Sequence, residues 1–151
     1  MRFKSYRLLL AIVLVLLFSC KGNVIYHHYE HVEDNAWSQS DTLNYLLPPA
    51  PHKGTYALEM GLRYGSDFPY RDITVVADFG MGVSDTLTIP FATNDGKPLG
   101  HGVGLLHKTI PLSNLQLNEG QQVTISIHHI MRREILPSIF EVGLKLSAQC
   151  Q

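Results

Sequence analysis

Apolar and polar residues alternate along most of this chain. The clearest case is residues 56–64, where every second residue from Tyr56 to Tyr64 is apolar and small or charged residues stand between them. A period of two over this length predicts a strand with one buried face. The same reasoning predicts further extended segments at 42–47, 73–79, 87–91, 105–112, 123–127 and 140–146.

Turn-forming residues separate these segments. The Pro-Pro-Ala-Pro run at 48–51 predicts a loop or a sheet edge, because proline cannot donate to a sheet ladder. The glycine-rich stretch 94–104 predicts a bulged turn between strands. Residues 130–136 have room for one helical turn, ended by Pro137, and no other segment shows a helical period. We therefore expect a single all-β domain, an antiparallel β-sandwich of jelly-roll or Ig-like type.

The first twenty residues follow a different pattern. Three basic residues precede an unbroken apolar run from Leu8 to Phe18, and Ser19 places a small residue immediately before Cys20. The run is too short to cross a bilayer, which takes about 20 residues. This is the layout of a lipoprotein signal peptide. We predict cleavage before Cys20 and attachment of two or three acyl chains there, which together hold a protein firmly at a membrane.

The signal divides the chain into three predicted parts. Residues 1–19 form the signal peptide, residues 20–41 the lipidated cysteine and a polar tether, and residues 42–151 the β-sandwich domain. Val24 to Tyr26 is apolar enough to add a strand, but the polar composition of the surrounding leader favours a tether.

Charge and cysteine usage exclude several classes of protein. Three of the twelve Lys and Arg residues lie in the signal peptide and all thirteen acidic residues lie after it, so the mature chain carries a net charge of −4 with histidines neutral. This argues against a nucleic-acid partner. Lipid on Cys20 leaves Cys150 as the only thiol, which excludes an internal disulfide; without lipid, the two cysteines could pair.

No motif for catalysis or cofactor binding stands out. The chain has eight histidines, yet it lacks a His-Glu-x-x-His motif, and the adjacent His128 and His129 point to opposite faces of a strand. We interpret the histidines as solvated or partner-contacting, with no metal site. The glycine-rich stretch lacks the Gly-Lys-Ser/Thr ending of a phosphate-binding loop, and no Gly-x-Ser-x-Gly nucleophile elbow occurs. We expect no enzyme activity, no cofactor and no small-molecule substrate.

The tryptophan and three of the arginines could have either a functional or a structural role. Trp37 is the sole tryptophan, and we favour a place at one end of the core over a ligand platform. Arg63, Arg132 and Arg133 stand near turns, where an arginine can clamp a loop through carbonyl groups or carboxylates. We favour this structural role over ligand binding.

Several segments in order along the mature chain resemble the GldH-type gliding-motility lipoproteins of the Bacteroidetes. Besides the signal, the resemblance rests on Trp37, on Asp41-Thr42-Leu43, on Arg63 before 68–73 (Phe-Pro-Tyr-Arg-Asp-Ile), on Asp85-Thr86, on the loop 95–102, on 131–136 (Met-Arg-Arg-Glu-Ile-Leu) and on 139–144 (Ile-Phe-Glu-Val-Gly-Leu). The candidate structural or partner-contact residues from these segments are Trp37, Arg63, Pro69, Tyr70, Gly100, Gly102, Met131, Arg132 and Gly143.

The resemblance implies a non-enzymatic part in the envelope machinery for gliding, with other envelope proteins of that machinery as partners and the membrane bound through Cys20. Bacteroidetes lipoproteins sent to the cell surface tend to carry acidic residues after the lipidated cysteine, and residues 21–24 have none. We therefore expect the outer membrane, with the domain facing the periplasm. The alternative is a glycan-binding β-sandwich that uses Trp37, Tyr64, Phe68 and Tyr70 as aromatic contacts.

Overall fold

The computed structural model describes residues 23–80 and 82–149. The predictions for the signal peptide, Cys20 and Cys150 lie outside the described residues. Strands make up most of the described chain, and every pair of neighbouring strands is antiparallel. None of the described residues forms a helix long and apolar enough to cross a bilayer.

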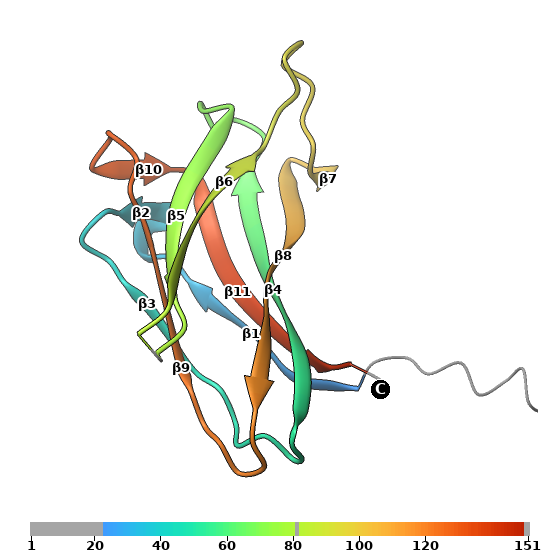
Figure 1. The fold of residues 1–151 in the computed structure, drawn as a ribbon. Coiled ribbons are helices and arrows are strands. Elements are labelled where there is room, and N and C mark those ends of the chain that lie inside the picture. The colour runs from blue at the N-terminus through green and yellow to red at the C-terminus, as the bar shows by residue number, and fades with distance from the viewer. Residues whose placement is uncertain (1–22, 81, 150–151) are drawn as a thin grey trace, which may run out of the picture.

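Two sheets pack face to face (Figure 1). The larger sheet has the order β1-β11-β4-β8-β7, and its strands are β1 (Val24–His31), β11 (Ile139–Ala148), β4 (Gly54–Gly65), β8 (Leu105–Leu117) and β7 (His101–Val103). The smaller sheet has the order β3-β9-β5-β6, and its strands are β3 (Leu43–Leu46), β9 (Thr124–His129), β5 (Asp72–Asp78) and β6 (Ser84–Pro90). The predicted antiparallel β-sandwich is confirmed.

A short two-stranded ribbon lies at one end of the sandwich (Figure 1). β2 (Ala36–Ser38) pairs with β10 (Ile135–Pro137), and the 3₁₀ turn η1 (Glu33–Asn35) leads into it. The helical turn predicted within 130–136 is therefore wrong. The backbone of 135–137 finds its partners in β2, about a hundred positions earlier in the chain, and a local pattern cannot reveal such a long-range pairing.

The core lies between the sheets and follows the alternation of the sequence. Tyr56, Leu58, Met60, Leu62 and Tyr64 of β4 are all buried. Hydrophobic burial of this kind contributes about 25 cal/mol for each Å² of apolar surface removed from water. Tyr45 of β3 adds a polar tie, because its hydroxyl donates a hydrogen bond of 2.7 Å to the carbonyl oxygen of Val142 in the facing sheet. Burial raises the pKa of Tyr45, so this donor stays protonated.

The tether predicted for 20–41 does not extend to residue 41. Residues 24–31 form β1, which pairs with β11 along its whole length, and Trp37 is fully buried. The leader looks polar because β1 is an edge strand whose outer side chains face solvent, so its apolar contacts fall on few positions. The folded domain therefore begins at Val24, and only residues 21–23 separate it from Cys20.

The two ends of the described chain lie side by side (Figure 1). The Ala148 N–H donates a hydrogen bond of 2.9 Å to the carbonyl oxygen of Asn23. The hairpin of β7 and β8 and the loop before it lie at the opposite end of the larger sheet. The chain ends and the β7–β8 hairpin thus lie at opposite ends of the domain.

Candidate functional site

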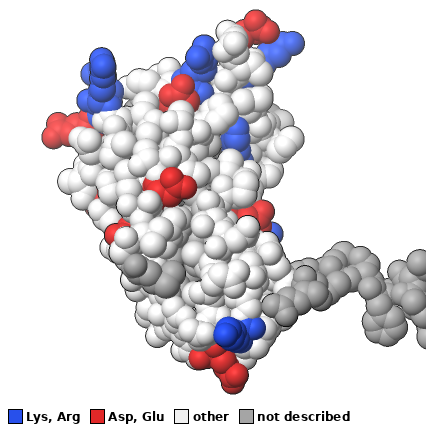
Figure 2. Space-filling model, viewed as in Figure 1, with Lys and Arg blue, Asp and Glu red and all other residues white. Residues whose placement is uncertain are grey.

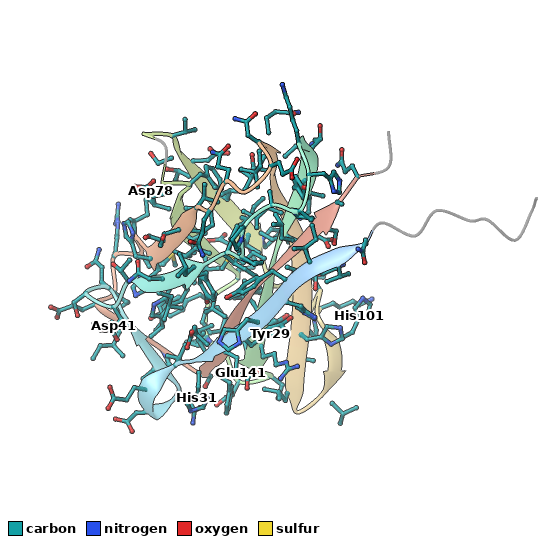
Figure 3. All side chains as sticks on the ribbon, turned by 90° about the horizontal axis from the view of Figure 1, so that it is seen from below. Tyr29, His31, Asp41, Asp78, His101 and Glu141 are labelled. Carbon is teal, nitrogen blue, oxygen red and sulfur yellow. The ribbon has the colours of Figure 1, made fainter. Side chains whose placement is uncertain are left out.

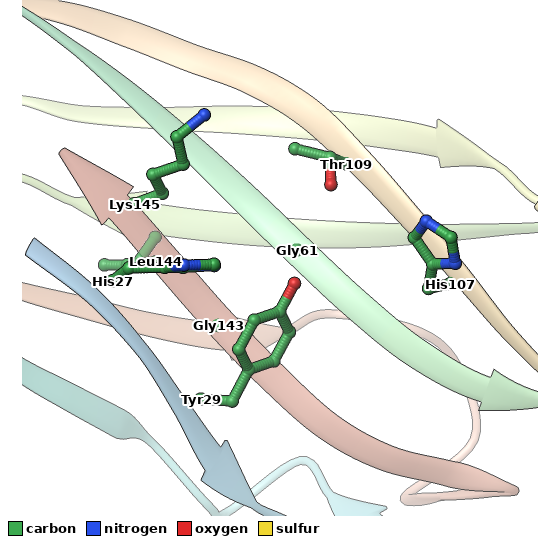
Figure 4. A pocket seen from close by; sticks show the side chains of 8 residues that line it. All are labelled: His27, Tyr29, Gly61, His107, Thr109, Gly143, Leu144 and Lys145. Atoms are coloured by element: carbon green, nitrogen blue, oxygen red, sulfur yellow. The ribbon is translucent and has the colours of Figure 1, made fainter. Parts of the chain in front are cut away.

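A groove crosses the outer face of the larger sheet. Four residues stand in register across four strands to form it: Tyr29, Gly143, Gly61 and Thr109. The groove has a volume of about 290 Å³ (Figure 4). Its lining residues are His27, Tyr29, Gly61, His107, Thr109, Gly143, Leu144 and Lys145.

Two glycines make the floor of this groove. Gly61 and Gly143 face each other across β4 and β11, and the Tyr29 side chain reaches over both from the edge strand β1 (Figures 3 and 4). A Cβ on Gly143 would lie 2.5 Å from Cδ1 of the Tyr29 ring, and a Cβ on Gly61 would overlap the Tyr29 hydroxyl. The missing side chains are therefore what allows the ring to lie against the sheet.

Two ion pairs between β4 and β11 flank the glycines. Lys145 Nζ lies 2.7 Å from Glu59 Oε2 on one side. On the other side, Arg63 NH1 lies 2.5 Å from Glu141 Oε2. The Arg63 guanidinium also lies 4.5 Å from the centroid of the Tyr29 ring, a cation–π distance. Both pairs are partly solvated, so their main effect is to fix side-chain positions around the groove.

Two histidine side chains complete the lining. His27 and His107 enter from opposite sides, on β1 and β8 (Figure 4). The His107 ring centroid lies 5.7 Å from that of His101 on β7. In the described part of the chain, no group of three or more His, Cys, Asp or Glu side chains is placed to hold a metal ion. The arrangement suits hydrogen bonding to a polar ligand more than metal chemistry.

A second hollow of about 100 Å³ lies among aromatic residues at the end of the domain where β4 ends, away from the start of β1. Tyr64 stacks on Phe91 with ring centroids 4.2 Å apart, and Phe68 meets both rings edge-on. Burial raises the pKa of the Tyr64 hydroxyl, and the Gly100 backbone partly offsets this. That contact lacks the geometry of a standard hydrogen bond. Beside this hollow, Leu99, Val103 and Leu105 expose apolar side chains.

A buried histidine lies in a third place, under the small ribbon. His129 is fully buried and meets Trp37 edge-on, with ring centroids 5.3 Å apart. The Met131 N–H donates to its Nδ1 at 3.4 Å, so Nε2 carries the proton and donates to the Trp37 carbonyl oxygen at 3.1 Å. Burial lowers the pKa of His129, which keeps the ring neutral. The interpretation of all histidines as solvated or partner-contacting is wrong for this one.

The structure places six of the nine predicted contact residues in or beside these three places. Arg63 and Gly143 belong to the groove, Tyr70 and Gly100 to the aromatic hollow or its rim, and Trp37 and Met131 to the surroundings of His129. The other three, Pro69, Gly102 and Arg132, are exposed. At Gly102, φ is +136° and a Cβ would overlap the carbonyl oxygen of Leu105, so its role is conformational.

Sequence reasoning missed most of the groove. Tyr29 lies in the segment that the sequence predicts as a tether, and the alternation in β4 predicts only that Gly61 faces outward. Thr109 and Lys145 lie far from Gly61 in the sequence, up to 84 positions away, so no local motif connects them to it. A signal did exist, because a glycine in the interior of a strand often marks a close approach, and both floor residues are such glycines.

Charged side chains are scattered over the face shown in Figure 2. Acidic and basic groups lie near one another, mostly toward the two ends of the domain, and most of that face is uncharged. This face has no extended patch of one sign.

The comparisons with known proteins identify the family. The GldH lipoprotein family model matches residues 24–146. The chain belongs to the GldH lipoprotein family. This match starts at the first residue of β1, which agrees with the domain boundary seen in the structure. No curated protein matches the sequence.

Several solved structures contain a domain whose fold is similar to that of this GldH-family chain. A Podospora anserina GH26-CBM35 β-(1,4)-mannanase has 16% identity and a TM-score of 0.47 over 84% of this chain and 29% of that one. The Cry4Aa toxin of Bacillus thuringiensis has 8% identity and a TM-score of 0.49 over 85% and 22%. The CBM35 of Cellvibrio japonicus Abf62 has 12% identity and a TM-score of 0.43 over 88% and 96%. This chain thus spans less than a third of the first two proteins.

Proposed function

We propose that this GldH-family lipoprotein is a lipid-anchored, non-enzymatic structural or interaction component of the gliding-motility machinery in the cell envelope. The observation that carries the proposal is the family match over residues 24–146, which covers nearly all of the described chain. The signal peptide that ends immediately before Cys20 supports the lipid anchor. Other envelope proteins of the same machinery are the proposed partners.

The short linker determines which end of the anchored domain lies near the membrane. Residues 21–23 span at most about 11 Å when fully extended, since each residue covers roughly 3.3–3.6 Å. Lipid on Cys20 therefore holds the start of β1 close to the membrane. The hairpin of β7 and β8 lies at the opposite end of the sheet and faces away (Figure 1). Its exposed Val103 and Leu105 support partner contact at that end.

We further propose the outer membrane as the location, with the domain on the periplasmic side. The support is the sequence after the lipidated cysteine, because residues 21–24 contain no acidic residue. Treating intact cells with protease separates the alternatives. A periplasmic domain stays intact until the outer membrane is opened, whereas removal of the domain from intact cells contradicts this placement.

Deleting the gene in the source bacterium tests the role. The proposal expects loss of surface spreading, restored by the wild-type gene and not by a Cys20→Ala variant expressed at the same level. Spreading and surface-protein export that are both unchanged after deletion contradict a part in the machinery. Restoration of spreading by Cys20→Ala contradicts the need for the lipid anchor.

The glycan-binding alternative loses two of the residues on which it first rested. Trp37 and Tyr64 are buried, and Phe68 and Tyr70 are half-buried and pack against the core. Trp37 and Tyr64 are therefore closed to a sugar, which removes two of the four aromatic contacts that this alternative needs.

A further inference from the structure

We propose that the groove over Gly61 and Gly143 binds one ring of a neutral saccharide. This inference goes beyond the proposed function and does not depend on it, because it rests on the groove alone. The groove lies on the outer face of the larger sheet and is partly open to solvent. Ligand pockets commonly measure roughly 300–1,000 Å³, so a volume of about 290 Å³ fits a single ring.

Available polar groups point to a hydroxyl-rich ligand. The Tyr29 hydroxyl, the Thr109 hydroxyl and the His107 ring line the groove, and none of them hydrogen-bonds another described residue. A hydroxyl or a neutral imidazole can both donate and accept a hydrogen bond, and so can each hydroxyl of a sugar. An apolar ligand would bury these groups without partners, at a cost of about 1–3 kcal/mol each.

The charges around the groove favour a neutral ligand. Lys145 is paired with Glu59, and Arg63 with Glu141, so these four groups together carry no net charge. Of these four groups only Lys145 lines the groove, and its carboxylate partner Glu59, 2.7 Å away, offsets much of its attraction for an anion. A neutral sugar needs no net charge in the site, and one of its hydroxyls can accept a hydrogen bond from the Lys145 ammonium group.

Rigid elements of the fold also form the groove. Its floor is the backbone of two central strands, and Tyr29 is held between that floor and the Arg63 guanidinium. A site built on strands and fixed side chains loses little conformational entropy when it binds. A monosaccharide in solution and the terminal ring of an envelope glycan present the same chemistry to such a site.

Binding assays on the lipidated mature protein test the proposal. The protein is kept in a detergent without a sugar headgroup, so that the detergent does not compete. Saturation-transfer NMR with glucose, galactose, mannose and N-acetylglucosamine reports on free sugars, and an array of neutral and anionic glycans reports on chain ends. The proposal expects binding of at least one neutral sugar or glycan; signals from the array alone assign the ligand to glycan ends.

Variants then locate the binding. Tyr29→Phe and Thr109→Val each remove one hydroxyl and keep the shape, and each should weaken binding about tenfold, the effect of losing one good hydrogen bond. The matched controls are Thr86→Val on β6 of the other sheet and His31→Ala beside the groove, and both should bind as the wild type does. Thermal unfolding curves show that every variant is folded.

Three results overturn the proposal. The first is a folded wild-type protein that binds no neutral saccharide on the array or at millimolar concentration in solution. The second is binding that Tyr29→Phe and Thr109→Val leave unchanged. The third is a preference for anionic glycans with no binding of neutral ones.

Discussion

Gly143 of β11 stands directly opposite Gly61 of β4, and the ring of Tyr29 lies over both. The two glycines meet different parts of that ring. Gly143 lies under its ring carbons, whereas Gly61 lies under the hydroxyl at its far end. This difference sets the order in which the two positions tolerate a side chain.

Substituting alanine at these glycines should destabilise the domain unequally. We expect Gly143→Ala to cost about 1–3 kcal/mol, because the ring base and the edge strand must shift, and Gly61→Ala to cost less. Urea unfolding measures both. In a Tyr29→Ala background, Gly143→Ala should lose most of its cost. An equal cost with and without Tyr29 would show that the ring is not what the glycine accommodates.

Removing the Tyr45 hydroxyl should weaken the contact between the sheets. Tyr45→Phe keeps the buried ring and leaves the Val142 carbonyl oxygen without this donor. We expect a loss of about 1–2 kcal/mol in the free energy of unfolding. The control is Tyr70→Phe, at a half-buried hydroxyl for which the structure shows no hydrogen bond, and it should change stability little. Equal stability of Tyr45→Phe and the wild type would contradict a stabilising role for the hydrogen bond from Tyr45 to Val142.

Stability should fall in mild acid because of His129. The folded pKa of this buried ring lies below its unfolded value of about 6.5, so the unfolded chain binds the proton more readily. The contribution of the neutral ring is therefore present above that pH and is lost as the pH falls toward the folded pKa. Trp37 contacts His129 and is the sole tryptophan, so its fluorescence reports the unfolding.

A His129→Gln variant provides the comparison. Glutamine can still donate to the Trp37 carbonyl and does not titrate. We expect a lower stability at pH 7.5 but a smaller decrease between pH 7 and pH 5 than in the wild type. The same decrease in both proteins would assign the pH dependence to other groups.

The boundary of the domain can be tested by truncation. Removing residues 24–31 strips β1 from β11 and exposes the backbone edge and apolar side chains that it covers, so we expect no cooperative unfolding transition. A chain that starts at Val24 should unfold at the same urea concentration as the mature protein. A stable, cooperative domain starting at residue 42 would restore the tether interpretation.

The sequence determines the strands because burial on one face leaves a period of two. Tyr56 to Tyr64 shows this most clearly, and there the predicted and observed strands agree almost to the residue. The outward position of Arg63 and its bond to a carboxylate follow from the same alternation and from guanidinium chemistry. The proposed lipid anchor at Cys20 is likewise predicted from local sequence.

Only the tertiary structure decides which strands lie together, because backbone pairing carries no sequence code of its own. β1 looks polar until its pairing with β11 is known, and 130–136 looks irregular until β10 meets β2. The groove depends on the same information. Tyr29, Gly143, Gly61 and Thr109 come from four strands and become one row through the register of three strand pairs, which long-range packing of the core fixes.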